Sequence, residues 1–267
     1  MIRVCLAGAT GWAGSELARA LARLDSEIDV VSAVARRSAG QTLGTALGDP
    51  RLVAPVFPTA NDALNHSSVD VFVEYTKPDV AKENVLAALR HGAHVVIGAS
   101  GLTDVDLVAI DAEAQRRQRG VLAVGNFALT AVLLLKFAEM AAKLIPQWEI
   151  IDYAHDDKKD APSGTARELA ARMSRARKPE QTIPVDQTLG ERHARGATVN
   201  GAQVHSIRLP GYVISAEAIF GMPDQRLSIR HDSGTSAKPY VDGALLAIRK
   251  VSGLIGLHRG LDAVLDL

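Results

Sequence analysis

The first 24 residues constrain the fold more than any other segment. Residues 2–7, IRVCLA, predict a short buried strand, and a glycine turn then leads into a helix whose apolar face carries Leu17, Leu21 and Leu24. The glycines follow a G-x-x-G-x-x-G spacing, where G-x-G-x-x-G is commoner. Any tight turn between strand and helix favours glycine, but after an N-terminal strand this spacing indicates a dinucleotide-binding turn. The expected cofactor contacts are Gly8, Ala9, Thr10, Gly11, Trp12 and Ala13.

Strands and helices alternate through residues 69–144. Residues 69–92, 93–120 and 121–144 each combine an apolar strand with a helical pattern. Such alternation predicts a parallel sheet with right-handed crossovers, and ligands bind beyond the carboxyl ends of its strands. The loops EYTKP, GASG and GNFAL should therefore share one rim. They add the cofactor candidates Thr76, Gly98, Ala99, Ser100, Val124, Gly125, Asn126 and Phe127. A loop-capping role for Asn126 is the alternative.

Two arginines follow the second predicted strand, IDVVSAVA (28–35). A site that prefers NAD would have Asp or Glu there for the ribose 2′-hydroxyl, whereas Arg36 and Arg37 suit a 2′-phosphate. The expected cofactor is therefore NADPH, with NADH as the alternative. Both arginines could instead be simply solvated.

The pattern changes after Pro146. Residues 148–155, WEIIDYAH, alternate like a strand, a helix follows, and residues 204–233 contain three more strand candidates. We expect a meander with one helix, an α+β domain for substrate binding and oligomerisation at residues 127–235. A Rossmann-type dinucleotide-binding α/β domain should comprise residues 1–126 and 236–267, completed by a final helix pair. A length of 267 residues suits two such domains.

A charged segment, HDDKKD (155–160), precedes the turn PSGT (162–165) and a helix predicted over ARELAARMSRAR (166–177). Gly164 lets a ligand approach the backbone, and the hydroxyls of Ser163 and Thr165 with free N–H groups predict an anion site suited to a carboxylate. A capping box of Thr165 and Glu168 is the alternative. Capping does not require the nearby cations, of which Lys158 is expected to neutralise a carboxylate or deliver a proton. The segment also contains His155 and Lys159. We expect Asp156 and Asp157 to be solvated and Asp160 to brace the turn.

Composition excludes several classes. Thirty basic and thirty acidic residues give no net charge, which argues against a general nucleic-acid binder. No apolar run reaches the roughly 20 residues of a membrane helix, and the N-terminus does not resemble a signal peptide. The single Cys5 fits a reducing cytoplasm. No metal site is expected, because no ligand spacing links the other histidines, which are His66, His91, His94, His193, His205, His231 and His258.

The run KKDAPSGTA (158–166) closely resembles the K-x-D-A-P-S-G-T-A signature of the dihydrodipicolinate reductase family. The similarity covers nearly the whole chain in order. GATGWAG resembles the family's cofactor turn, VFVEYTKPDV its strand ending in F-T-x-P-E, VVIGASGL its I-G-T-T-G loop and GNFALTAVLLLKF its N-F-S-x-G-x-N segment. HSIRLPG and IFGMPDQRLSIRHDS resemble its later strands. The DAPSGTA run is specific, and the glycine turn is not.

The resemblance implies a reductase that passes hydride from NAD(P)H to an unsaturated cyclic dicarboxylate, and a homotetramer. It implies that Lys158 is the proton donor and that Ser163, Gly164 and Thr165 hold a substrate carboxylate. His155 matches the second residue of a family histidine pair and implies a contact to substrate.

The chain departs from the family pattern at the first histidine of that pair, which is Ala154 here. The family's H-x-V-x-F strand reads SAEAIF, and Ala99 and Ser100 replace two threonines. A methyl group performs no acid–base chemistry, so a paralogous reductase of another cyclic imine or enamine acid is the alternative. A non-catalytic nucleotide-binding protein is disfavoured because Lys158 and the anion loop are retained. A semialdehyde-dehydrogenase chemistry is excluded because its cysteine nucleophile is missing downstream of Cys5.

Overall fold

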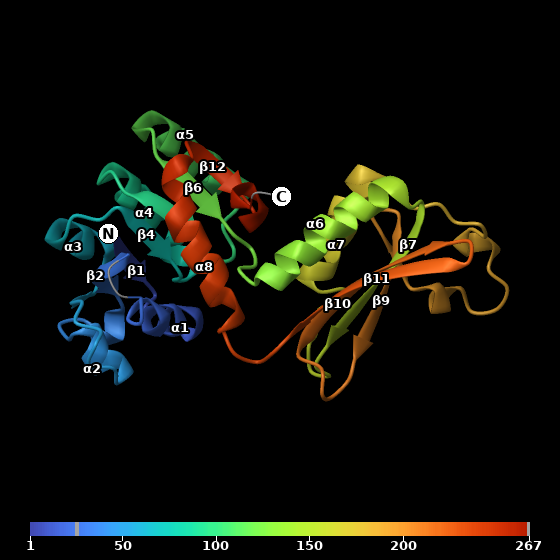
Figure 1. Ribbon diagram of the computed structural model, residues 1–267, viewed down its shortest axis with the longest axis horizontal. Coiled ribbons are helices and arrows are strands. Elements are labelled where there is room, and N and C mark those ends of the chain that lie inside the picture. Colours follow the sequence, from blue (N-terminus) through green and yellow to red (C-terminus); the bar gives the residue numbers. More distant parts are fainter. Residues whose placement is uncertain (25–26, 266–267) are drawn as a thin grey trace. The chain divides into compact units, whose positions relative to one another are not determined.

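The computed structural model describes residues 1–24 and 27–265, which form two compact units (Figure 1). Unit 1 comprises Met1–Leu129 and Ala237–Leu267, and unit 2 comprises Thr130–Ser236. Each unit has its own sheet and its own core.

Unit 1 is built on a seven-stranded sheet in the order β12-β6-β5-β4-β1-β2-β3, and all its strand pairs are parallel. The expected Rossmann-type arrangement is confirmed. The strands are β1 (Ile2–Ala7), β2 (Ile28–Val34), β3 (Val56–Phe57), β4 (Val71–Glu74), β5 (His94–Ile97), β6 (Gly120–Ala123) and β12 (Gly256–Arg259).

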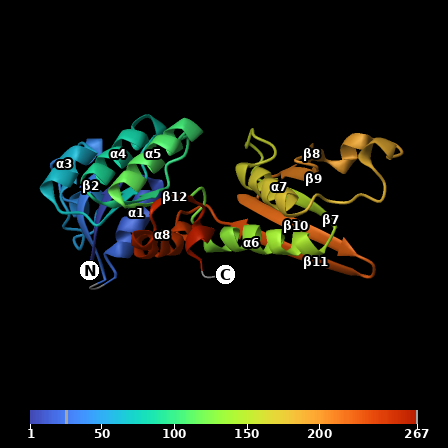
Figure 2. The same ribbon diagram turned by 90° about the horizontal axis from the view of Figure 1, so that it is seen from above.

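Helices cover both faces of this sheet. Figure 2 shows α3, α4 and α5 on one face and α1 and α8 on the other. The helices are α1 (Trp12–Leu21), α2 (Leu43–Leu47), α3 (Ala60–His66), α4 (Pro78–Arg90), α5 (Asp104–Arg117) and α8 (Pro239–Lys250). Short 3₁₀ turns lie at η1 (Arg36–Ser38), η4 (Val251–Gly253) and η5 (Leu261–Val264). The C-terminal segment returns to unit 1 as expected, but the predicted helix pair is wrong. After α8 the chain adds β12 beside β6, because residues 256–259 continue the parallel ladder.

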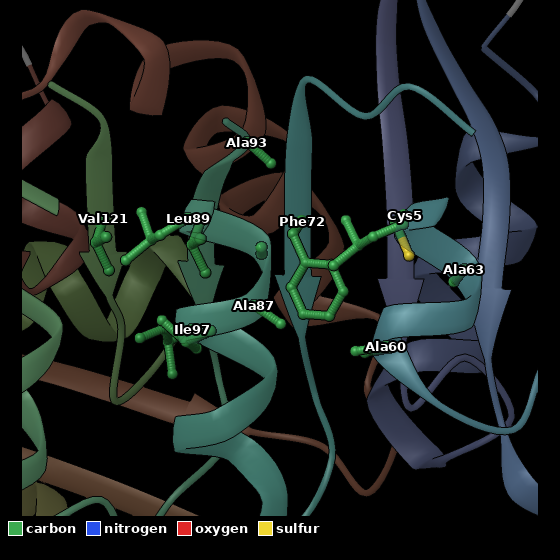
Figure 3. Packing of buried hydrophobic residues seen from close by; sticks show 14 of the residues in the cluster. Cys5, Ala60, Ala63, Phe72, Ala87, Leu89, Ala93, Ile97 and Val121 are labelled. Atoms are coloured by element: carbon green, nitrogen blue, oxygen red, sulfur yellow. The ribbon is translucent and has the colours of Figure 1, made fainter. Parts of the chain in front are cut away.

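The core under α3, α4 and α5 is centred on Phe72, which is fully buried in β4 (Figure 3). Cys5 lies in the same cluster, on β1. Burial raises the pKa of its thiol to about 12, so Cys5 is a packed apolar side chain and no nucleophile.

Unit 2 is a mixed five-stranded sheet in the order β11-β10-β7-β9-β8. Its strands are β7 (Gln147–Ala154), β8 (Ala197–Val199), β9 (Ala202–Arg208), β10 (Ile214–Met222) and β11 (Gln225–Ser233). Helices α6 (Leu129–Leu144) and α7 (Gly164–Ala176) bury Ile150, Val204 and Phe220, all from this sheet. Two 3₁₀ turns, η2 (Val185–Gln187) and η3 (Arg192–Arg195), precede β8.

The α+β class of unit 2 is confirmed, but the expected meander is wrong. Strand β7 pairs antiparallel with β10 and parallel with β9. A parallel pair needs a crossover, and α7 lies on it. The segment that starts α7 is therefore the connection that leaves the carboxyl end of β7.

None of the helices within the described residues is long and apolar enough to span a membrane.

Candidate functional site

The glycine turn between β1 and α1 brings backbone close to backbone. Gly8 has φ +78°, and a Cβ there would lie 2.5 Å from the carbonyl oxygen of Tyr75. A Cβ at Gly14 would lie 2.2 Å from the carbonyl oxygen of Gly8. The fold thus requires glycine at both positions, since a side chain would push α1 and the loop after β4 away from the turn. Helix α1 starts after Gly11 without a side-chain cap, which leaves its first N–H groups for a ligand.

A cavity of about 550 Å³ opens beside this turn, within unit 1. It unites six of the predicted cofactor residues: Gly8, Thr10, Gly11, Arg36, Arg37 and Thr76. Further lining residues were not among the predicted contacts; they include Pro58, Thr59, Tyr75, Lys77, Val80 and Asn84. Tyr75 and Lys77 belong to the predicted rim loop EYTKP, whereas Pro58, Thr59, Val80 and Asn84 carry no sequence signature and join the cavity only through the pairing of β1, β2 and β4.

Arg36 and Arg37 lie in η1, directly after β2, as the strand pattern predicted. Both side chains are exposed, and neither forms an ion pair with any residue in the described part of the chain. Two guanidiniums without a protein partner on a cavity wall suit an anionic group of the ligand.

A buried carboxylate supports the same wall. Glu74 ends β4 and accepts hydrogen bonds from the Thr76 amide at 2.6 Å and from Asn84 Nδ2 at 2.9 Å. The Thr76 hydroxyl also donates to it. Burial raises the pKa of Glu74 above its usual range. Sequence reasoning missed this group, although an acid at the end of an apolar strand could have indicated it.

The remaining predicted cofactor residues lie outside the lining of this cavity. Ala9, Val124 and Phe127 are buried, with at most 5% of their surface exposed. Trp12 is 58% exposed and packs edge-on against Tyr240. Asn126 Oδ1 accepts from the Ala128 amide at 2.9 Å, the loop-capping alternative. The others are Ala13, Gly98, Ala99, Ser100 and Gly125.

The second and third rim loops nevertheless adjoin the cavity through Tyr75. Gly98 and Ala99 donate their amides to the Glu74 carbonyl at 2.9 and 3.1 Å. A Cβ at Gly98 would collide with the rings of Tyr75 and Phe127, which pack edge-on at 5.5 Å. These loops therefore fix the ring that lines the cavity.

In unit 2 the charged segment leaves the end of β7. Lys158 is 19% exposed, and its Nζ lies 2.6 Å from Asp160 Oδ1. This hydrogen bond holds the pKa of Asp160 below its usual range. Asp160 also lies 3.9 Å from Arg167, which fits the predicted bracing role. His155 bonds the exposed Asp157, so that carboxylate is paired and not merely solvated.

Helix α7 begins at Gly164, two residues before the start predicted at Ala166. Its cap is Ser163, whose hydroxyl accepts from the Ala166 amide at 3.3 Å. The capping box of Thr165 and Glu168 is wrong, because Glu168 instead pairs with Arg172 at 2.9 Å. Gly164 and Thr165 are thus the first helical residues, and their N–H groups lie at the positive end of the helix. A Cβ at Gly164 would meet no protein atom within 4 Å, which leaves the helix start open to a ligand.

Two of the departures from the family pattern, Ala154 and the SAEAIF strand, lie in the sheet of unit 2. Ala154 is fully buried at the end of β7, and Ala216 of the SAEAIF strand is buried on β10. Two further basic residues lie in different units: Arg208 pairs with buried Asp152 at 2.8 Å in unit 2, and Lys238 is exposed in unit 1, before α8. Within residues 1–24 and 27–265, no cluster of three or more His, Cys, Asp or Glu side chains could hold a metal ion.

A parallel α/β unit with a glycine turn, joined to a mixed-sheet unit that presents a lysine and an open helix start, defines a two-domain nicotinamide-dependent oxidoreductase. The family model described as dihydrodipicolinate reductase, N-terminus, matches residues 2–127, and the one described as its C-terminus matches residues 130–265. The chain belongs to the dihydrodipicolinate reductase family.

Individual relatives agree along the full length. A protein named 4-hydroxy-tetrahydrodipicolinate reductase from Halalkalibacterium halodurans is 37% identical over 266 residues, covering 100% of both chains. One of the same name from Geobacillus thermodenitrificans is 37% identical over 265 residues, covering 99% of each. The dipicolinate-bound dihydrodipicolinate reductase from Paenisporosarcina sp. TG-14 superposes with TM-score 0.87 at 32% identity, over 99% of this chain and 100% of that one. An amine dehydrogenase from Mycobacterium smegmatis shares only the fold, with TM-score 0.69 at 16% identity over 100% and 96% of the two chains.

Proposed function

We propose that this chain reduces 4-hydroxy-tetrahydrodipicolinate to tetrahydrodipicolinate with NADPH as the hydride source. The observation that carries the proposal is a lysine held by Asp160, Lys158, on the loop that leads into the open helix start at Ser163–Thr165, in a chain of this family. The names of the relatives and the dipicolinate bound to the Paenisporosarcina enzyme support a cyclic dicarboxylate as substrate.

The cavity of unit 1 fits a dinucleotide. The close approach at Gly8 and the uncapped start of α1 suit the pyrophosphate, and Arg36 and Arg37 suit a 2′-phosphate. The bound nicotinamide would supply the hydride. Because the arginines replace the acid that would favour NADH, NADPH is the proposed cofactor and NADH the weaker alternative.

In unit 2, the Ser163 hydroxyl and the Gly164 and Thr165 amides would hold one substrate carboxylate. Lys158 would deliver the proton from Nζ, which Asp160 holds in place, and His155 would contact the substrate. General acid catalysis by a positioned side chain contributes about 10²–10⁴ in rate, so the loss of the first histidine at Ala154 places this burden on Lys158.

A paralogous activity is the second candidate, favoured by the buried methyl groups of Ala154 and Ala216 at positions where the family pattern has histidine. It keeps the cofactor and the lysine but reduces another cyclic imine or enamine acid. We further propose a homotetramer and a cytoplasmic location, which rest on the family resemblance; sedimentation of the purified protein measures the first.

A steady-state assay tests the proposal. 4-Hydroxy-tetrahydrodipicolinate is generated enzymatically in the cuvette, and NADPH oxidation is followed with and without the purified chain. We expect oxidation that depends on both substrate and protein. Absence of turnover, with a control reductase active in the same cuvette, would reject the proposed substrate in favour of the paralogue.

A further inference from the structure

The buried ion pair of Asp152 and Arg208 is outside every role assigned so far. We propose that this pair positions the anion-binding loop, residues 158–165, and so sets the affinity for the substrate carboxylate. The inference rests on the proposed function and names residues that would act through the loop without touching the substrate.

Arg208 reaches the loop from β9. Its Nη2 donates to Asp152 Oδ2 at 2.8 Å and to the carbonyl oxygen of Asp160 at 2.7 Å. Its Nη1 donates to the carbonyl oxygen of Ile207 at 2.9 Å, which fixes the guanidinium against its own strand. One planar group therefore joins the middle of the loop to the sheet.

Asp152 reaches the other end of the loop from β7. Its side chain is fully buried, and Oδ2 accepts from the Ser163 amide at 2.9 Å and from Ser206 Oγ at 3.2 Å. Asp152 stands opposite Ser206 in the parallel ladder, and Ala154 stands opposite Arg208. The pairing of β7 with β9 thus sets the separation of Asp152 and Arg208, the two side chains that bond the loop.

Stability alone does not account for this arrangement. Burying two charges costs desolvation, and an apolar pair of similar volume is often as stable. Asp152 Oδ1 and Arg208 Nε are also buried without a partner among the described residues. The pair adds two directed hydrogen bonds to the loop, which we call tethers. Arg208 bonds the carbonyl oxygen of Asp160, whose side chain holds Lys158. Asp152 bonds the amide of Ser163, the N-cap of α7.

The tethers prearrange the groups proposed to bind and protonate the substrate. Lys158 and the start of α7 lie on either side of the tethered points, so a loosened loop would spread them apart. Loss of pre-organisation weakens ligand binding even where each binding group is still present.

The test compares Arg208→Lys with the wild type and with Arg177→Lys. The lysine keeps the charge beside Asp152 but loses the planar fork. Arg177 pairs with exposed Glu180 at 2.6 Å at the end of α7 and serves as the matched control. Dissociation constants are measured by calorimetry for NADPH and for dipicolinate, and the steady-state constants are measured in parallel.

For Arg208→Lys we expect the dissociation constant of dipicolinate and the KM of the substrate to rise by about tenfold, since hydrogen bonds to charged groups are the strong ones. NADPH affinity should stay within about twofold, because the cofactor cavity lies in unit 1. A purely structural role would lower the active fraction and kcat while leaving KM and dipicolinate affinity unchanged. Unchanged dipicolinate affinity in folded Arg208→Lys overturns the inference.

A second variant covers the case in which Arg208→Lys does not fold. The neutral pair Asp152→Asn with Arg208→Gln leaves no unpaired buried charge, and it should show the same loss of dipicolinate affinity. Wild-type affinity in this variant overturns the inference and leaves the proposed function standing. Failure of the wild type itself to bind dipicolinate rejects the proposed site, and the inference with it.

Discussion

At the residue scale, two adjacent lysines have different surroundings. Lys158 is mostly buried and bonded to Asp160, whereas Lys159 is exposed. A proton donor needs a fixed position relative to the reacting atom, and only Lys158 has one. The sequence run KKD does not distinguish the two by itself; the bond to Asp160 does.

Lys158→Ala should therefore lower kcat by about 10²–10⁴ and leave NADPH affinity unchanged. Lys159→Ala is the matched control and should keep wild-type turnover. Steady-state kinetics with calorimetry measure both effects. Wild-type turnover in Lys158→Ala would remove it as the proton donor.

We expect the two arginines after β2 to determine the preference for NADPH over NADH. Replacing Arg36 and Arg37 together by Ala should raise the KM for NADPH about tenfold or more, since a hydrogen bond to a charged group contributes about 1.5–3 kcal/mol. The KM for NADH should hardly change, because NADH lacks the 2′-phosphate. Arg90→Ala, in the last turn of α4, is the control. An equal loss for both cofactors would contradict the assignment.

At the element scale, local pattern and long-range pairing contribute differently. Hydrophobic periodicity and short apolar runs predicted β1, α1 and the alternation of strands and helices that follows, because each of these patterns lies within about 20 residues of sequence. Strands β3 and β8 have two and three residues and carry no periodicity. The parallel pairing of β7 with β9 depends on residues 50 or more apart, so the meander prediction failed there.

The packing of α1 on the glycine turn gives a prediction for that element. Gly14→Ala places a methyl group 2.2 Å from the Gly8 carbonyl oxygen, and α1 must move. We expect a loss of about 1–3 kcal/mol in stability, the usual cost of overpacking, together with weaker NADPH binding. Gly253→Ala, where a Cβ meets no atom within 4 Å, should leave both unchanged. Thermal unfolding and calorimetry measure the two effects, and a neutral Gly14→Ala would show that the turn tolerates a side chain.

The contact of α6 with β11 predicts a pH dependence. His231 is buried, its Nδ1 lies 2.9 Å from Thr130 Oγ1, and burial lowers its pKa from 6.5. The unfolded chain therefore binds a proton more readily, so stability is lost as pH falls below about 6.5 towards the folded pKa. His231→Gln should reduce the drop in melting temperature between neutral and mildly acidic buffer. An identical drop in both proteins would contradict this contribution of His231.

At the scale of the whole molecule, local sequence motifs indicate the candidate binding residues but not the buried side chains that hold those residues in position. The glycine turn, Arg36, Arg37, Lys158 and the loop before α7 could be proposed as site candidates from the sequence because each stands in a local motif. Glu74 and the pair of Asp152 with Arg208 were not predicted, since each acts through partners supplied by folding. The alanine at position 154 becomes informative only by comparison with the family pattern, which has a histidine there.

One calorimetric experiment tests the central claim most directly. NADPH is titrated into the purified, folded protein, and dipicolinate is then titrated into the NADPH-saturated sample. The account predicts that both ligands bind, each with one site per chain. No association with NADPH or NADH in well-folded protein would contradict the account.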